Sequence, residues 1–301
     1  MNPSDRVLQF EQYFPKSLTR LTLLTVAYFV LDLMASDWSS VFAWILILFG
    51  MIAIGIPHGA LDVVTYSSRF NRARPVYYII GYLTCIALVI GCWLAIPNIT
   101  LMGFLLLSAW HFGQADFELW QIERGALIWG ATVLSFILGW HLPETTPILN
   151  AMGISEEWTS GWTEYENRIQ LITAIGLFFS GLISIWKGKR SWSGAVLLIA
   201  STAWMPLLIG FALYFVGLHS AAGWTHLQAN LNRSAKDLWR VALPYSVGAW
   251  LIFALGIWYW NDQDPANTEA TVGAFFALLS SLSIPHIIET HFFLRHRLHP
   301  S

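Results

Sequence analysis

The sequence predicts an all-α, polytopic transmembrane helix bundle, and three observations support this fold class. The 301 residues are 56% hydrophobic and 11% charged, whereas an average soluble domain carries about 25% charged residues. The mean hydropathy is +0.55. Long apolar segments follow one another along the chain, separated by short polar turns, as in proteins that cross a bilayer repeatedly. We therefore expect a single integral membrane domain over residues 1–301.

Ten apolar segments are the expected spans, so the bundle should have about ten helices. They run over residues 21–36, 39–64, 75–96, 99–120, 125–141, 169–186, 191–204, 206–228, 240–260 and 272–294. Residues 191–228 would make a helix of about 57 Å, which is too long for one crossing. We therefore place a break at Pro206 and expect one broken pair, whose shorter half is either a span or a re-entrant segment.

The basic residues predict how the chain is oriented in the cell membrane. Cytoplasmic loops carry an excess of Lys and Arg. When the spans alternate, one side receives the basic N-terminal segment, the basic loops at 69–74 and 187–190, and the C-terminal tail. The other side receives the acidic loops at 144–166 and 261–269. Both termini are therefore predicted to be cytoplasmic. The net charge of −2, without a basic stripe, argues against a nucleic-acid partner.

Several histidines are expected at a similar depth, in the cytoplasmic half of separate spans. His58, His111, His219 and His286 lie in the second, fourth, eighth and tenth segments. One such histidine is more often a hydrogen-bonded core residue than a ligand. Four at one depth favour a metal site, because imidazole is a neutral ligand for Fe, Cu and Zn. His226 lies two helical turns after His219 and is the alternative fourth ligand.

Two of these histidines occur in similar short sequences, Ile-Pro-His followed within four residues by an acid. On a regular helix, Asp62 shares a face with His58 and can orient it as a ligand. A carboxylate that reaches toward the lipid headgroups is the alternative. Pro57 removes a helical hydrogen bond and Gly59 lacks a side chain, so an irregular helix is expected here. The repeated sequence around His286 suggests two similarly bent helices.

At these positions the sequence resembles the Brp/Blh family of membrane-embedded β-carotene 15,15′-dioxygenases. The matching pieces are Pro57-His58-Gly59-Ala60-Leu61-Asp62, Trp110-His111-Phe112-Gly113 followed by Asp116, Phe211 to Ser220 ending in Leu218-His219-Ser220, and Pro285-His286. The resemblance implies an Fe²⁺ enzyme that splits the central double bond of β-carotene with O2 and gives two retinal molecules. It places the histidines at 58, 111 and 219 on ligand positions. We expect the acids at 62 and 116 to lie beside the ligands and orient them.

The resemblance also shows a departure. The family pattern has a second histidine four residues after His219, where this chain has Gly223. Either His286 or His226 completes the site, or the site has three histidines, or this chain has lost or changed the activity.

Aromatic residues near the histidines are candidates for the walls of a slot that binds a lipid-soluble carotenoid. They are Trp110, Phe112, Tyr214, Phe215 and Trp224, for each of which core packing is the alternative. We expect the carotenoid to enter from membrane lipid and the retinal to pass to a retinal-binding protein. Two other classes of function stay open, a transporter or proton relay that uses intramembrane His and Asp, and a carotenoid- or retinal-binding protein without catalysis.

Overall fold

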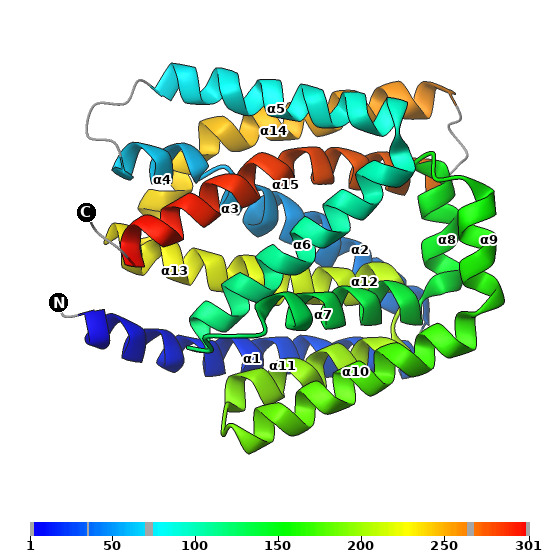
Figure 1. Cartoon of the computed structure of the whole chain (residues 1–301), viewed down its shortest axis with the longest axis horizontal. Coiled ribbons are helices and arrows are strands. Elements are labelled where there is room, and N and C mark those ends of the chain that lie inside the picture. Colours follow the sequence, from blue (N-terminus) through cyan, green and yellow to red (C-terminus); the bar gives the residue numbers. More distant parts are fainter. Residues whose placement is uncertain (1–2, 35, 70–74, 264–267, 299–301) are drawn as a thin grey trace. The chain divides into compact units, whose positions relative to one another are not determined.

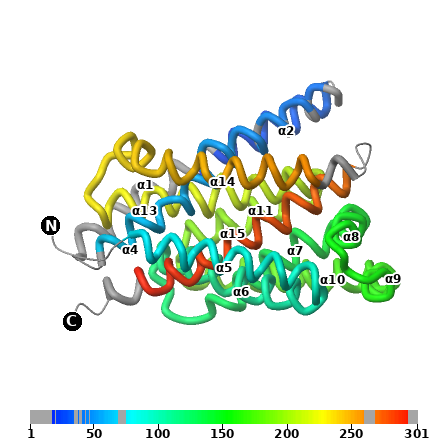
Figure 2. The backbone as a smooth tube through the Cα atoms, turned by 90° about the horizontal axis from the view of Figure 1, so that it is seen from above, coloured from blue at the N-terminus to red at the C-terminus, as the bar shows by residue number. Residues whose placement is uncertain are grey.

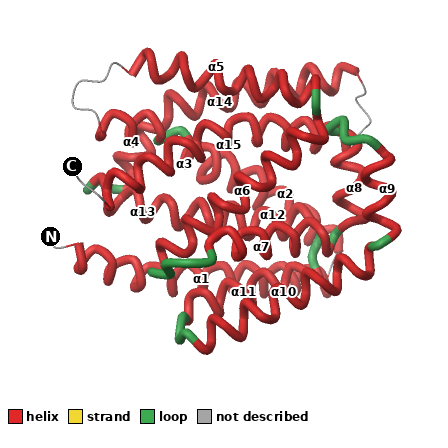
Figure 3. Tube along the Cα trace, viewed as in Figure 1, coloured by secondary structure: helices red, strands yellow, loops and turns green. Residues whose placement is uncertain are grey.

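The structure, a computed structural model, consists of helices joined by short loops (Figure 1). It describes residues 3–34, 36–69, 75–263 and 268–298, and no strand occurs among them (Figure 3). The predicted all-α class is confirmed. The chain ends and the loops 70–74 and 264–267, on which the orientation prediction partly depends, lie outside the described residues, and that orientation stays a prediction.

The chain forms two compact units, each assembled from three separate stretches of sequence. The first unit comprises Met1–Gly55, Phe112–Leu142 and Tyr165–Arg233, and the second comprises Ile56–His111, Pro143–Glu164 and Ser234–Ser301. The units are therefore interleaved along the sequence. That the chain is a single membrane domain stays a prediction.

The first unit is built around two π-helices that lie side by side, η1 and η3. Its elements are α1 (Pro3–Met34), α2 (Ser36–Gly50), η1 (Met51–Gly55), the C-terminal part of α6 (Pro97–Leu119), α7 (Ala126–Trp140), α10 (Glu166–Trp186), α11 (Arg190–Ser201), η2 (Thr202–Trp204), α12 (Leu207–Ala212), η3 (Leu213–Ser220) and α13 (Ala221–Leu231). Helix α10 packs against α7 and α11, and α1 packs against α2, α11, α13 and η3.

The second unit is organised around α15, which contacts α3, α4, α5 and α14. Its elements are α3 (Ile56–Gly59), α4 (Asp62–Arg69), α5 (Pro75–Ala95), the N-terminal part of α6, α8 (Leu142–Ala151, from its second residue), α9 (Glu156–Glu164), α14 (Ala235–Gln263) and α15 (Thr268–Leu298). Figure 2 shows α14 and α15 running beside each other.

Six helical segments are long and apolar enough to cross a membrane, among the residues described. They are Ile47–Ser68, Pro75–Ala95, Glu166–Trp186, Leu207–Leu231, Ala235–Tyr259 and Thr268–Phe293. A seventh arises if α7 and α8, which are bent by 93° at their junction, form one broken span. The described residues of the remaining expected segments, 21–36, 99–120 and 191–204, are helical but do not meet the same criteria of length and composition. The count of ten spans stays a prediction.

Several of these helices expose large apolar side chains. On α5, Leu88 and Leu94 are 65% and 75% exposed, and on α10, Phe178 and Trp186 are 62% and 83% exposed. Such surfaces are unfavourable in water but not in hydrocarbon. The helical backbone satisfies its own hydrogen bonds, as the interior of a bilayer requires. The chain is therefore a membrane protein, and these exposed side chains are suited to contact lipid.

The irregular helix predicted at Pro57 and Gly59 is confirmed. The chain passes from η1 into the four-residue α3, then through a turn at Ala60 and Leu61 into α4. In contrast, α15 continues through Pro285 without interruption. The two Ile-Pro-His sequences therefore form helices that are built differently, although their residues are alike.

The predicted helix break at Pro206 is also confirmed, and a buried histidine stabilises it. Helix η2 ends at Trp204, Met205 is extended and α12 begins at Leu207. The ring of His141 reaches this break, with Nε2 3.0 Å from the carbonyl oxygen of Thr202 and 2.9 Å from that of Met205. Since backbone groups freed by a break need partners when buried, His141 has a structural role here.

Candidate active site

Three histidine rings gather on α15 in the second unit. His286 lies edge to face against His58 of α3, with ring centroids 5.0 Å apart, and against His111 of α6, with ring centroids 5.2 Å apart. Two imidazoles bound to one ion, with each nitrogen about 2.1 Å from it, have ring centres roughly 5 Å apart. Three of the four predicted ligands are therefore neighbours, and the spacing of His286 to each of the other two resembles that of two ligands of one ion.

The cluster is not a completed coordination sphere. Among the described residues, no group of three His, Cys, Asp or Glu side chains has the geometry of a metal site. The donor chemistry nevertheless suits a transition metal, because the gathered side chains are imidazoles, which bind such metals in their neutral form. The residues thus fit a metal ion in chemical type, while the described side chains do not form a coordination geometry.

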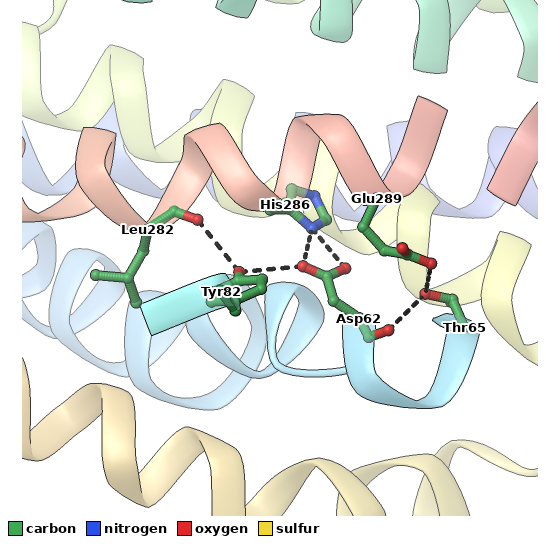
Figure 4. A network of polar contacts seen from close by, with 6 residues as sticks. All are labelled: Asp62, Thr65, Tyr82, Leu282, His286 and Glu289. Atoms are coloured by element: carbon green, nitrogen blue, oxygen red, sulfur yellow. Dashed lines mark hydrogen bonds and ion pairs between the residues drawn. The ribbon is translucent and has the colours of Figure 1, made fainter. Parts of the chain in front are cut away.

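Asp62 fixes the orientation of His286 (Figure 4). Nδ1 of the ring donates to the carboxylate, lying 2.9 Å from Oδ1 and 3.0 Å from Oδ2. The opposite nitrogen, Nε2, is buried and has no hydrogen-bond partner in the described part of the chain. In the neutral ring, a proton on Nδ1 leaves the lone pair at Nε2. Histidines that bind metals are commonly held in this way by a carboxylate.

The regular helix expected to carry both His58 and Asp62 is interrupted. The turn at Ala60 and Leu61 separates α3 from α4, so the spacing of four residues does not place the two side chains on one regular helix. The carboxylate instead points to α15, a segment more than 200 residues later in the chain.

A second acid completes a reciprocal arrangement between α4 and α15. Glu289, one turn after His286, lies with Oε1 2.9 Å from Oγ1 of Thr65 on α4. Asp62, the acid after the first Ile-Pro-His sequence, therefore bonds to α15, which carries the second. Glu289, the acid after the second, bonds to α4, which follows the first (Figure 4). These buried polar contacts tie the two helices together at the depth of the histidine cluster.

His219 belongs to the first unit and lies on the π-helix η3, where it is 4% exposed. Its ring centroid is 4.6 Å from that of Phe112, 5.9 Å from Phe215 and 6.5 Å from Tyr214. Three of the proposed slot residues therefore surround this histidine with aromatic surface. π-Helices are rare and frequently occur at functional sites.

Asp116 lies in the first unit with partners unlike those of Asp62. It is 1% exposed and accepts hydrogen bonds from Nε1 of Trp129 at 2.7 Å and from the hydroxyl of Tyr214 at 3.1 Å. Neither donor is a predicted metal ligand. The contact fixes the ring of Tyr214, which packs against Phe112 at 5.4 Å and stacks with His219. Asp116 was predicted to lie beside a ligand. In the structure it is linked to the predicted ligand His219 only indirectly, through the ring of Tyr214.

The remaining predicted residues have other neighbours. His226 lies with Nε2 3.7 Å from Oε1 of Glu118 in the first unit. The indole of Trp224 donates to the backbone oxygen of Ile54 at 3.1 Å. In the second unit, Trp110 packs against His291, with ring centroids 4.7 Å apart.

One member of the network was missed by sequence reasoning. Tyr82 lies within the apolar span of α5, and its hydroxyl is 3.1 Å from Oδ2 of Asp62. A tyrosine far from the ends of a span is unusual, because tyrosine is enriched at the membrane interfaces. The position of Tyr82 within the span could therefore have indicated a polar partner. The pairing of Asp62 with His286 had no such indication in a single sequence.

The fold and the site define a polytopic membrane protein with a partly buried cluster of imidazoles and carboxylates. A model of the β-carotene 15,15′-dioxygenase family matches residues 49–293. The chain belongs to this family, and the matched range contains every predicted site residue.

A named relative supports the same assignment. The β-carotene 15,15′-dioxygenase of the uncultured marine bacterium 66A03 is 28% identical to this chain over 282 residues, which covers 88% of this chain and 96% of the relative. No solved structure matches the chain. The predicted family and the prediction of a carotenoid-cleaving enzyme are confirmed, and neither comparison supports the transporter or the non-catalytic binding protein.

Proposed function

We propose that this protein cleaves the central double bond of β-carotene with O2, giving two retinal molecules, and that iron(II) bound by histidines supports the reaction. The family and the named relative support the substrate and the reaction. The main support for the iron site is the arrangement of the two ring nitrogens of His286. Its Nδ1 is held by Asp62, its Nε2 is buried and without a hydrogen-bond partner in the described residues, and two more imidazole rings lie against it.

The proposed ligands are His58, His111, His286 and His219. The first three are in ring contact within one unit, and the fourth is expected from the family resemblance. Gly223 offers no ligand, so we propose that His286 takes the part of the missing histidine. His226 is the weaker candidate, because its Nε2 faces Glu118. Four neutral imidazoles would suit iron and add no charge inside the membrane.

The protein residues have distinct tasks in this proposal. When bound, iron(II) supplies the ability to activate O2. Asp62 keeps the proton of His286 on Nδ1, so that Nε2 is ready to bind. Phe112, Tyr214 and Phe215 are proposed to line the slot for the polyene, and their apolar surface excludes water. Both oxygen atoms of O2 enter the two aldehyde products, so the reaction needs no other reductant.

The membrane setting follows from the same proposal. β-Carotene dissolves in hydrocarbon, so it can reach the protein through the apolar faces of the spans without crossing water. We propose that the protein is a multi-pass protein of the cell membrane with its metal site in the cytoplasmic half. The released retinal then passes to a retinal-binding protein.

The proposal is tested by expression in a host that makes β-carotene. The native chain should bleach the cells and produce retinal, measured by chromatography of extracts. His58→Ala and His111→Ala should abolish both effects while the proteins still accumulate in the membrane. Leu88→Ala, which changes a 65% exposed side chain, is the matched control.

Cells that keep their β-carotene despite abundant native protein and iron would contradict the dioxygenase assignment. An iron(II) chelator should stop retinal formation in isolated membranes, and added iron(II) should restore it. Full activity in the presence of the chelator would contradict the iron site alone.

A further inference from the structure

The hydroxyl of Tyr82 lies where three helices meet in the second unit. Tyr82 belongs to α5, and its oxygen is 3.1 Å from Oδ2 of Asp62 at the start of α4 and 3.2 Å from the carbonyl oxygen of Leu282 on α15 (Figure 4). Leu282 stands one helical turn before His286. The hydroxyl therefore sits beside the segment of α15 that presents the histidine.

The hydroxyl has one proton and faces two acceptors. A hydrogen bond to an ionised carboxylate is stronger than one to a backbone carbonyl. In addition, helical carbonyls such as that of Leu282 are ordinarily satisfied by the backbone four residues later. The proton of Tyr82 is therefore best donated to Asp62, and the close approach to Leu282 fixes where the phenol oxygen lies.

The carboxylate of Asp62 needs such a second donor to be held in one orientation. Nδ1 of His286 is nearly equidistant from the two carboxylate oxygens, at 2.9 Å and 3.0 Å. This contact alone leaves the carboxylate plane weakly fixed. A hydrogen bond from Tyr82 to Oδ2 distinguishes the two oxygens and locks the plane. Fixing Asp62 in turn fixes the ring of His286 and the direction of its Nε2.

We infer that Tyr82 is a positioning residue for the proposed iron site, acting on His286 through Asp62. The inference rests on the proposed function, because it assigns Tyr82 to the histidine cluster that is proposed to bind iron. Outer groups that orient metal ligands are typically worth about 10-fold to 100-fold in metal affinity or activity. Tyr82 is one step further from the ion than Asp62, so its effect belongs at the lower end.

The test measures Co²⁺ binding by the full chain in detergent micelles, with Co²⁺ as a spectroscopic probe for iron(II). The variants are Tyr82→Phe, Asp62→Asn and the double variant, and His286→Ala reports on the site itself. Tyr77→Phe is the matched control, since Tyr77 lies on the same helix and is 68% exposed. Thermal unfolding is measured for each variant, to show that the helices remain folded.

Tyr82→Phe should weaken Co²⁺ binding about 10-fold, while Tyr77→Phe leaves it unchanged. In the Asp62→Asn background, Tyr82→Phe should have no further effect, because residues that act in series are not additive. Tyr82→Phe with the native affinity would overturn the inference, as would an equal loss in both backgrounds. If His286→Ala also binds Co²⁺ with the native affinity, the proposed iron site fails, and the inference fails with it.

Discussion

The two units each contain a buried aspartate that accepts a hydrogen bond from a tyrosine, but their other partners differ. In the second unit, Asp62 pairs with Tyr82 and with Nδ1 of His286. In the first unit, Asp116 pairs with Tyr214 and with Nε1 of Trp129. An indole has one polar atom, which the bond to Asp116 uses up. An imidazole has two, so the bond to Asp62 leaves Nε2 available.

This difference indicates which of the two buried acids can act on a metal-binding side chain. A carboxylate that holds a histidine sets the tautomer of a ring that can bind a metal. A carboxylate that holds an indole and a phenol fixes packing, because neither partner has a further nitrogen to offer. We therefore expect substitutions around Asp62 to change metal binding and activity, and substitutions around Asp116 to change mainly the free energy of unfolding.

The largest effect is expected for His286→Ala. It removes a proposed ligand and leaves Asp62 buried without its main partner. Retinal formation should fall more than about 100-fold, since partners outside the ligand shell alone are worth up to that factor. The amount of retinal formed per folded protein, measured by chromatography, checks this. His286→Ala with near-native activity would remove His286 from the ligand set and leave His226 as the alternative.

Asp62→Asn should have the next largest effect, a loss of retinal formation of about 10-fold to 100-fold. The amide keeps the shape of the carboxylate but cannot hold the histidine ring with an ionic acceptor. Iron affinity should fall in parallel, and saturating iron should recover part of the activity. An unchanged affinity together with reduced protein stability would mean that Asp62, like Asp116, is structural.

Asp116→Asn should act mainly on stability. The substitution replaces an ionic acceptor in a fully buried contact, which typically costs about 1–3 kcal/mol. The loss of retinal formation per folded molecule should be smaller than for Asp62→Asn. Chemical unfolding in mixed micelles measures the free energy of unfolding, and the expression assay measures the retinal formed. If Asp116→Asn impairs iron binding as strongly as Asp62→Asn does, the proposed difference between the two acids is contradicted.

The smallest effect is expected for Tyr214→Phe. It removes one hydrogen bond to Asp116 and retains the ring that packs against Phe112, so the free energy of unfolding should fall by about 1 kcal/mol. Tyr82→Phe should instead lower the affinity for the metal ion. Unfolding and Co²⁺ binding measured on both variants would show whether the two tyrosines differ in this way.

Features set by local chain chemistry could be predicted from the sequence. Apolar segments predicted the helical membrane fold, Pro57 with Gly59 predicted the irregular helix, and Pro206 predicted a break. The strongly bent pair α7 and α8 was not anticipated, because the chain there reads as one apolar run followed by a polar loop.

Which side chain pairs with which across distant segments could not be predicted. The gathering of His58, His111 and His286 was expected because the predicted spans place all three at one depth. Which acid faces which histidine depends on how helices rotate about their axes, and depth does not determine rotation. That is why Asp62 was expected beside His58, and why Tyr82 was missed.

The central claim is that the histidine cluster binds iron through Nε2 of His286. The most direct measurement is the iron content of the native protein and of His286→Ala, purified without oxygen after growth with ample iron. The account predicts about one iron per chain in the native protein and a large loss in the variant. A native protein that forms retinal but retains no iron, or a variant that retains it fully, would contradict the account.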